Sequence, residues 1–174
     1  MDLLADSGEA IYYDSDPAGE EAAELLAVAA AKYGSEAAEQ ALLRAYFLEP
    51  ENLTVLVALY RYLFYGSRLA ETQLVAERAV GVAARRLGLD PDWRQVSAAG
   101  VDQALTVSVD LVRFYLSALR GMGYLLMRRY ALEEALQLFA KVEELDRDGR
   151  FAVRPLIEIA QQALNERHGK STEE

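Results

Sequence analysis

Apolar residues recur at steps of three and four along most of the chain, the spacing that places them on one face of an α-helix. The clearest instance is residues 118–148, where Tyr130 separates two such stripes. The first stripe contains Leu119, Met122, Leu126 and Met127, and the second contains Leu132, Ala135, Leu136, Phe139, Val142 and Leu145. Gly123 lies within the first stripe, where the missing side chain lets a neighbouring helix approach closely. The pattern predicts two helices packed against each other.

Capping residues predict four helices before this pair. Asp16 is the expected N-cap of the first helix, with Pro17 at its first helical position. Ser35 and Asn52 are suitable N-caps for later helices. The expected helices cover residues 17–32, 36–49, 53–65 and 69–87. The inward-facing residues expected of the fourth helix are Leu74, Val75, Ala76, Ala79, Val82 and Ala83.

Residues 88–100 interrupt the helical pattern. Asp90 and Pro91 are typical of the start of a short helix, which would contain Trp93. The extra length fits either an extended loop or an early start of the next helix, and we favour one long helix over residues 101–129. We expect the insertion to leave Trp93 exposed, which would make a homodimer plausible.

The two ends of the chain differ from the helical body. Residues 1–15 are acidic and poor in apolar side chains, which predicts a flexible acidic arm. Residues 16–168 are expected to form a single domain, with the irregular insertion at 88–100 and a last helix at about 151–165. That helix should cap the domain with one polar side, and residues 169–174 should be disordered. Its inward-facing residues are Ile157, Ala160 and Leu164.

The paired stripes resemble the tetratricopeptide repeat (TPR), a helix-turn-helix unit of about 34 residues that stacks into a solenoid. The residues at its packing positions are Leu119, Met122, Gly123, Leu126, Leu132, Ala135 and Phe139 in one repeat and Ala38, Leu42, Ala45 and Pro50 in another. The pattern departs at Arg147, where the family usually has proline. The resemblance implies an all-α, right-handed α-solenoid of about three helical hairpins plus a C-terminal capping helix.

Three longer stretches add a narrower resemblance. The segments LEPENLTVLVALYRYLFY, ARRLGLDPDW and FYLSALRGMGYLLMRR are similar to small bacterial TPR proteins encoded among nitrogen-fixation genes. This resemblance covers about residues 48–146 and implies a role accessory to nitrogen fixation. Type III secretion chaperones with three TPR repeats are the alternative, because they are similarly small and acidic and bind client segments in a groove. Residues 1–15 lack the amphipathic N-terminal helix expected of those chaperones.

Composition narrows the choice of partner. The chain has 174 residues, a formal net charge of −10 and no cysteine. An acidic surface repels nucleic acid and anionic lipid, so we expect neither nucleic acid nor membrane as a partner. The N-terminus shows no signal-peptide pattern, and no apolar stretch is long enough to span a bilayer. These features favour a cytoplasmic protein that binds other proteins.

The sequence carries no recognisable catalytic pattern. The only histidine, His168, lies near the C-terminus, and the absence of cysteine excludes thiolate metal sites and cysteine nucleophiles. Adjacent carboxylates such as Glu133 and Glu134 point to different sides of a helix, so they do not form an acid/base pair. No glycine-rich phosphate loop or EF-hand spacing appears. We therefore predict a protein-protein interaction scaffold or adaptor without catalytic residues, metal or cofactor, with an enzyme as the remote alternative.

In a TPR stack the first helix of each hairpin lines a concave groove, and this register selects the candidate binding residues. They are Arg61, Phe64, Tyr65, Arg120, Tyr124, Met127 and Arg128, with Thr54, Val57 and Ser117 at further groove positions. Arginine and tyrosine often anchor interfaces, so we expect an acidic or aromatic segment of a partner protein. The alternatives are that these residues only pack and pair with neighbouring glutamates, or that the arm of residues 1–15 folds back into the groove and competes with a partner.

Overall fold

The computed structural model describes the backbone of residues 16–171 and the side chains of residues 16–167. All regular structure in these residues is helical, which confirms the predicted all-α class. The acidic arm predicted at 1–15 lies outside the described residues. The helices are α1 (Glu20–Ala31), α2 (Glu36–Leu48), α3 (Leu53–Tyr65), α4 (Leu69–Leu87), the 3-10 helix η1 (Trp93–Gln95), α5 (Ala98–Ala104), α6 (Val109–Arg128), α7 (Leu132–Leu145) and α8 (Arg154–Ser171).

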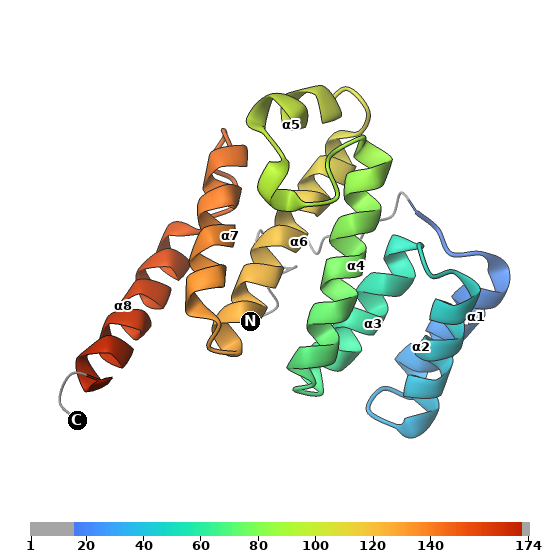
Figure 1. Ribbon diagram of the computed structural model, residues 1–174. Helices are drawn as coiled ribbons and strands as arrows, with labels where there is room; N and C mark the ends of the chain where they lie inside the picture. Colours follow the sequence, from blue (N-terminus) through green and yellow to red (C-terminus); the bar gives the residue numbers. More distant parts are fainter. Residues whose placement is uncertain (1–15, 172–174) are drawn as a thin grey trace.

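Each long helix packs on the long helices that precede and follow it in the chain. Figure 1 shows them side by side, from α1 and α2 at one end of a row to α7 and α8 at the other. The short helix α5 is the exception, because it lies across one end of the row and contacts α6 and α7.

The boundaries of α2 and α3 agree with those predicted from caps, and α4 covers the predicted residues 69–87. The Ser35 hydroxyl accepts a hydrogen bond from the Ala38 N–H at 3.3 Å, and the Asn52 side chain accepts one from the Val55 N–H at 3.1 Å. Both bonds satisfy N–H groups that the helix leaves without an internal partner. At the other end of α4, Gly88 has φ 70°, a left-handed conformation that glycine adopts without strain.

Asp16 does not cap the first helix as predicted. The helix begins later, at Glu20, with Gly19 at the N-cap. The Asp16 carboxylate instead accepts a hydrogen bond from the Leu53 N–H at 2.7 Å and pairs with Arg86 at 2.9 Å. The Asp16 carboxylate therefore accepts a hydrogen bond from the first N–H of α3 and forms an ion pair with Arg86 at the end of α4. It links residues that are distant in sequence.

The predicted long helix over residues 101–129 is wrong, because two helices occupy this stretch. The chain leaves the helical path after Ala104, and α6 starts at Val109 with the Ser108 hydroxyl accepting from the Leu111 N–H at 3.2 Å. The intervening Thr106 and Val107 are β-branched, which disfavours helix, and Ser108 offers a cap instead. Leu105 and Val109, on either side of the break, are 40% and 47% exposed.

Three other expectations need correction. Trp93 is only 9% exposed and belongs to the main core, so the predicted exposure that favoured a homodimer is wrong. Leu74 is 66% exposed rather than inward-facing, because it lies on the outer side of α4. The last helix continues to Ser171, into the stretch predicted to be disordered, and its predicted inward-facing Ala160 is buried.

The main core lies between α4, α6 and α7. Phe114, Tyr115 and Phe139 are its largest fully buried side chains. A Cβ atom added to Gly123 would lie 2.5 Å from Cε1 of Phe139, so the glycine is what allows this ring to press against α6. The close helix approach predicted at Gly123 is therefore confirmed.

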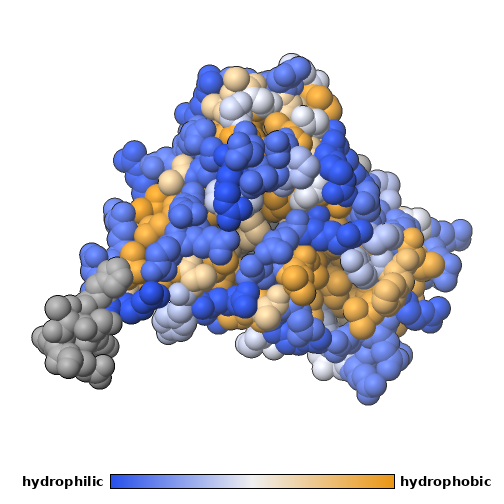
Figure 2. All heavy atoms as spheres, in the orientation of Figure 1, coloured by the Kyte–Doolittle hydropathy of each residue, from blue (hydrophilic) through white to orange (hydrophobic). Residues whose placement is uncertain are grey.

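Apolar side chains also reach the surface at the α1–α2 end of the row. Phe47 is 79% exposed, and its α2 neighbours Leu43 and Leu48 are exposed as well. Figure 2 shows hydrophobic surface gathered where these two helices lie. No helix among the described residues is long and apolar enough to cross a membrane.

Candidate partner-binding face

The rings of Phe64 and Tyr124 join α3 to α6, and this contact brings two of the predicted site residues together. Their centroids are 6.4 Å apart. Phe64 also stacks on Tyr60 at 5.9 Å and meets Tyr65 edge-on at 5.6 Å. The result is a continuous aromatic cluster across two helices that are separated in sequence by α4 and α5.

Helical spacing places the predicted arginines beside this cluster. Arg61 precedes Phe64 and Tyr65 by three and four positions, and Arg120, Tyr124 and Arg128 follow one another at steps of four. The guanidinium of Arg128 lies over the Tyr124 ring, 6.0 Å from its centroid. We call this surface the α3–α6 face and define it by Arg61, Phe64, Tyr65, Arg120, Tyr124, Met127 and Arg128.

The residues of the α3–α6 face differ in their exposure. Tyr65 is 51% exposed and Arg128 is exposed, whereas Arg61, Phe64, Tyr124 and Met127 are half-buried. Arg120 is 8% exposed and is the only buried charged side chain among those the structure describes. Tyr65 and Arg128 are therefore the most accessible side chains of the α3–α6 face.

Two predicted groove residues take part in packing. Ser117 is 2% exposed and lies within the buried stretch of α6, so its assignment to the groove is wrong. Met127 is half-buried and packs against the main core. Sequence spacing alone did not separate these positions from the surface ones because both lie on the same side of α6.

Beneath the aromatic cluster lies a small apolar cavity between α3, α4 and α6. It has a volume of about 20 Å³, and its lining includes Tyr60 of α3 and the small residues Ala118 and Gly121 of α6. Ligand pockets usually measure about 300 to 1,000 Å³. A cavity this small holds about one water molecule, so it is not itself a small-molecule pocket.

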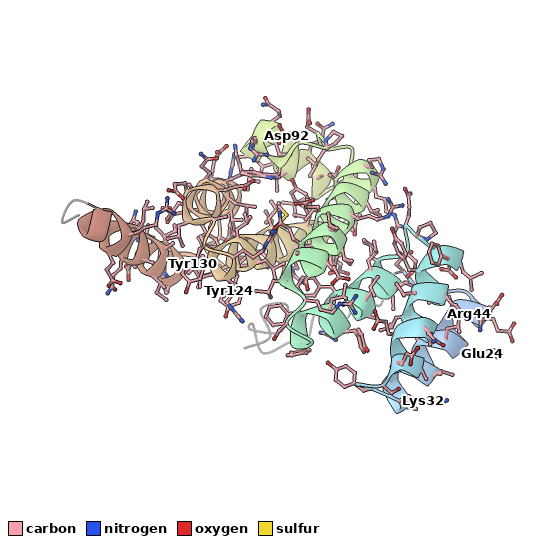
Figure 3. The ribbon with its side chains drawn as sticks, turned by 60° about the horizontal axis from the view of Figure 1, so that its bottom comes forward. Glu24, Lys32, Arg44, Asp92, Tyr124 and Tyr130 are labelled. Atoms are coloured by element: carbon pink, nitrogen blue, oxygen red, sulfur yellow. The ribbon has the colours of Figure 1, made fainter. Side chains whose placement is uncertain are left out.

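A second, larger hollow was not predicted from the sequence. It lies between α4, η1, α6 and α7, with a volume of about 230 Å³. Arg94 lies over the Trp93 ring at 4.3 Å and pairs with Asp92 at 3.4 Å and with Glu134 at 3.2 Å. In Figure 3, Asp92 lies well apart from Tyr124. No sequence signal marked this hollow, since Trp93 was expected to be exposed.

Arg68, Glu71 and Tyr115, which lie outside the α3–α6 face, have shifted pKa values. Hydrogen bonds to Glu71 and Glu39 raise the pKa of Arg68, and the bond to Arg68 lowers the pKa of Glu71. Burial, and then the nearby carboxylates of Asp90 and Asp92, raise the pKa of Tyr115. Within the described residues, no group of three or more His, Asp or Glu side chains is placed to hold a metal ion.

The described helices define an all-α protein, and sequence comparison places it in a family. The chain is 39% identical over 159 residues to an "uncharacterized 19.8 kDa protein in nifW 5'region" from Azotobacter chroococcum mcd 1, an alignment that covers 91% of this chain and 88% of that protein. The chain belongs to the family of that protein. No protein-family model matches the chain. No solved structure matches it either.

Proposed function

We propose that the protein is a non-catalytic interaction scaffold or adaptor of the cytoplasm, whose α3–α6 face binds an extended segment of a partner protein. The observation that carries this proposal is the aromatic contact between Phe64 and Tyr124, which joins two helices into one surface flanked by the exposed Tyr65 and Arg128. Exposed tyrosine and arginine side chains of this kind suit contact with a polypeptide segment.

We further propose that the helices form a TPR-like right-handed solenoid with a concave groove. Support comes from three helix pairs, α1–α2, α3–α4 and α6–α7, that pack within themselves and onto their neighbours. The Gly123–Phe139 contact also brings together a small and a large residue that occupy packing positions in the TPR pattern. In this architecture α1, α3 and α6 line the groove.

The chemistry of the face favours an acidic or aromatic partner segment. Arg61 and Arg128 give its surface positive charge, with the buried Arg120 beside them, in a protein whose formal net charge is −10. A carboxylate can accept charge-assisted hydrogen bonds from guanidinium groups, and an aromatic side chain can stack on the exposed rings. Arginine and tyrosine are also the side chains that most often dominate binding energy at interfaces.

The biological process is proposed from the relative. Its printed description places that protein in the nifW 5' region, so we propose that this chain is accessory to nitrogen fixation. The same relative favours this proposal over a type III secretion-like chaperone. The proposal leaves the protein without a catalytic role, and enzymatic turnover lost on Arg128→Lys would overturn that part.

The test is an affinity pull-down from the source cell with a Tyr65→Ala, Arg128→Glu double variant. Both side chains are exposed, so the substitutions avoid the buried Arg120. We expect the partner to be lost, because one aromatic anchor is removed and one cation is reversed.

The matched control is a Tyr33→Ala, Arg44→Glu double variant. Tyr33 is 59% exposed and meets Tyr62 edge-on at 5.9 Å, much as Tyr65 meets Phe64. Figure 3 shows Arg44 on α2, away from Tyr124. Both variants change the net charge equally. A partner retained by the control and lost by the α3–α6 variant supports the proposal, and equal recovery on both would refute it.

A further inference from the structure

The described chain begins at the edge of the α3–α6 face. The Asp16 backbone oxygen accepts a hydrogen bond from the Thr54 hydroxyl at 2.9 Å, and its carboxylate accepts from the Leu53 N–H at 2.7 Å. The same carboxylate pairs with Arg86 of α4 at 2.9 Å. Residues 1–15 are therefore tethered at a fixed point beside the first turn of α3.

Thr54, which holds Asp16, lies on the same side of α3 as two residues of the α3–α6 face. Thr54, Arg61 and Tyr65 follow one another at steps of seven and four, so they share one side of α3. From Thr54 to Tyr65 the helix rises about 16 Å, at about 1.5 Å per residue. Fifteen extended residues reach up to about 50 Å. Residues 1–15 are thus long enough to cover α3 and continue onto α6.

Residues 1–15 also have the chemistry that the α3–α6 face selects. They contain four carboxylates, two neighbouring tyrosines and no lysine or arginine. The carboxylates are Asp2, Asp6, Glu9 and Asp14, and the tyrosines are Tyr12 and Tyr13. The face supplies Arg61 and Arg128 at its surface, beside an aromatic cluster. The segment and the face are therefore complementary in charge and in ring contacts.

We propose that residues 1–15 occupy the α3–α6 face of their own chain and compete there with a partner segment. The competition rests on the proposed function, whereas the docking of residues 1–15 does not. A short tether gives an effective concentration on the order of 1 mM. A segment with an intrinsic Kd of about 0.1 mM would then fill the face roughly nine-tenths of the time and weaken partner binding roughly tenfold. A partner must displace residues 1–15 to bind.

Docking can be tested by pulsed electron paramagnetic resonance on the full chain. The chain has no cysteine, so Ser7→Cys and Leu74→Cys give a unique pair of spin-label sites, the second on an exposed position of α4. We expect a narrow distance distribution. It should broaden when the four carboxylates are neutralised by Asp2→Asn, Asp6→Asn, Glu9→Gln and Asp14→Asn.

A control neutralises the same number of exposed carboxylates outside the α3–α6 face. Its substitutions are Glu24→Gln, Asp110→Asn, Asp148→Asn and Glu158→Gln. This control should keep the narrow distribution, because it changes the net charge equally and leaves residues 1–15 intact. A broad distribution in the unmodified chain would overturn the proposal. So would a narrow one that survives neutralisation, because the carboxylates would then not hold the segment.

Competition is tested with a fluorescent peptide of residues 1–15 added to the full chain. Its anisotropy should report binding to the chain with neutralised residues 1–15 roughly tenfold tighter than to the unmodified chain or the control. Equal affinity for all three would overturn the proposed competition. The resonance measurement needs no partner, so it can support docking even if the pull-down finds no partner. If the pull-down finds a partner and the resonance measurement shows no docking, only the proposed function is supported.

Discussion

The α6–α7 pair and the α1–α2 pair are built from different side chains. Between Leu111 and Leu126, α6 buries nearly every residue, and Leu138, Phe139 and Val142 of α7 have no exposed surface. In α1 the buried residues are Ala22 and Ala29. Large side chains therefore hold one pair together, and mostly small ones hold the other.

This difference predicts an uneven distribution of stability. Full burial of a large apolar side chain contributes about 1.5 to 3 kcal/mol, in proportion to the area removed from water, so an alanine contributes much less. The side chains of α6 and α7 share one core with α4, whereas α1 and α2 form smaller clusters at the end of the row. The α1–α2 pair should open locally at lower free energy than α6–α7.

The largest expected effect is that of Phe139→Ala. Removing this fully buried ring should lower the free energy of unfolding by about 3 to 5 kcal/mol, measured by denaturant titration. Leu42→Ala in α2 should cost about 2 kcal/mol, at the low end for a buried leucine, because the end of the row can close around the gap. A larger loss for Leu42→Ala than for Phe139→Ala would reverse the comparison.

Gly123→Ala should have the next largest effect. The new Cβ would overlap the Phe139 ring, so we expect a loss of about 1 to 3 kcal/mol in the same titration. Gly81→Ala in α4 is the matched control. At Gly81 the added Cβ would meet only Arg85 Nη1 at 3.7 Å. Because alanine has a higher helix propensity than glycine, the substitution should stabilise the protein by about 0.5 to 1 kcal/mol. Stabilisation by both substitutions would show that α6 and α7 are not pressed together at Gly123.

Tyr115→Phe should have the smallest effect near neutral pH. The Tyr115 hydroxyl is buried and has no hydrogen-bond partner among the described residues, so its removal should change stability by no more than about 1 kcal/mol.

The alkaline behaviour of the same variant is a sharper test. Because burial raises the pKa of Tyr115 in the folded state, the unfolded chain ionises first, and the wild type should lose stability as pH rises above about 10. Tyr115→Phe should reduce that loss in unfolding curves recorded at increasing pH, and Tyr33→Phe at an exposed position should not. Identical alkaline profiles for all three proteins would show that the Tyr115 hydroxyl is not shielded in the folded state.

The sequence predicted best those elements whose signals are local. Ser35, Asn52 and Gly88 mark helix ends by their own conformation or hydrogen bonds, and the boundaries near them were correct. Periodicity correctly identified the buried stripes of α6 and α7. The close approach at Gly123 could also be predicted, because a glycine within an apolar stripe has few other reasons to be there.

Local signals failed where a distant partner decides the conformation. Asp16 looks like an N-cap, but the Leu53 N–H and Arg86 compete for its carboxylate, and neither is visible from residues 16–20. Trp93 lies in an irregular segment, and only the arrangement of α4, α6 and α7 shows that it is buried. At the candidate site, the helix register selected Tyr65 and Arg128, which are exposed, but placed the buried Ser117 with them.

The hydrogen bond and the ion pair of Asp16 also set an order for folding during synthesis. The partners of Asp16 are Leu53 and Arg86, so the two interactions cannot both form until α4 has been made. At about 5 to 20 residues per second, the ribosome adds Arg86 about 4 to 14 s after Asp16. During that interval the alanine-rich α1–α2 pair must remain folded without the ion pair between Asp16 and Arg86. The slow step for the N-terminal end of the nascent chain is therefore the wait for a residue made much later.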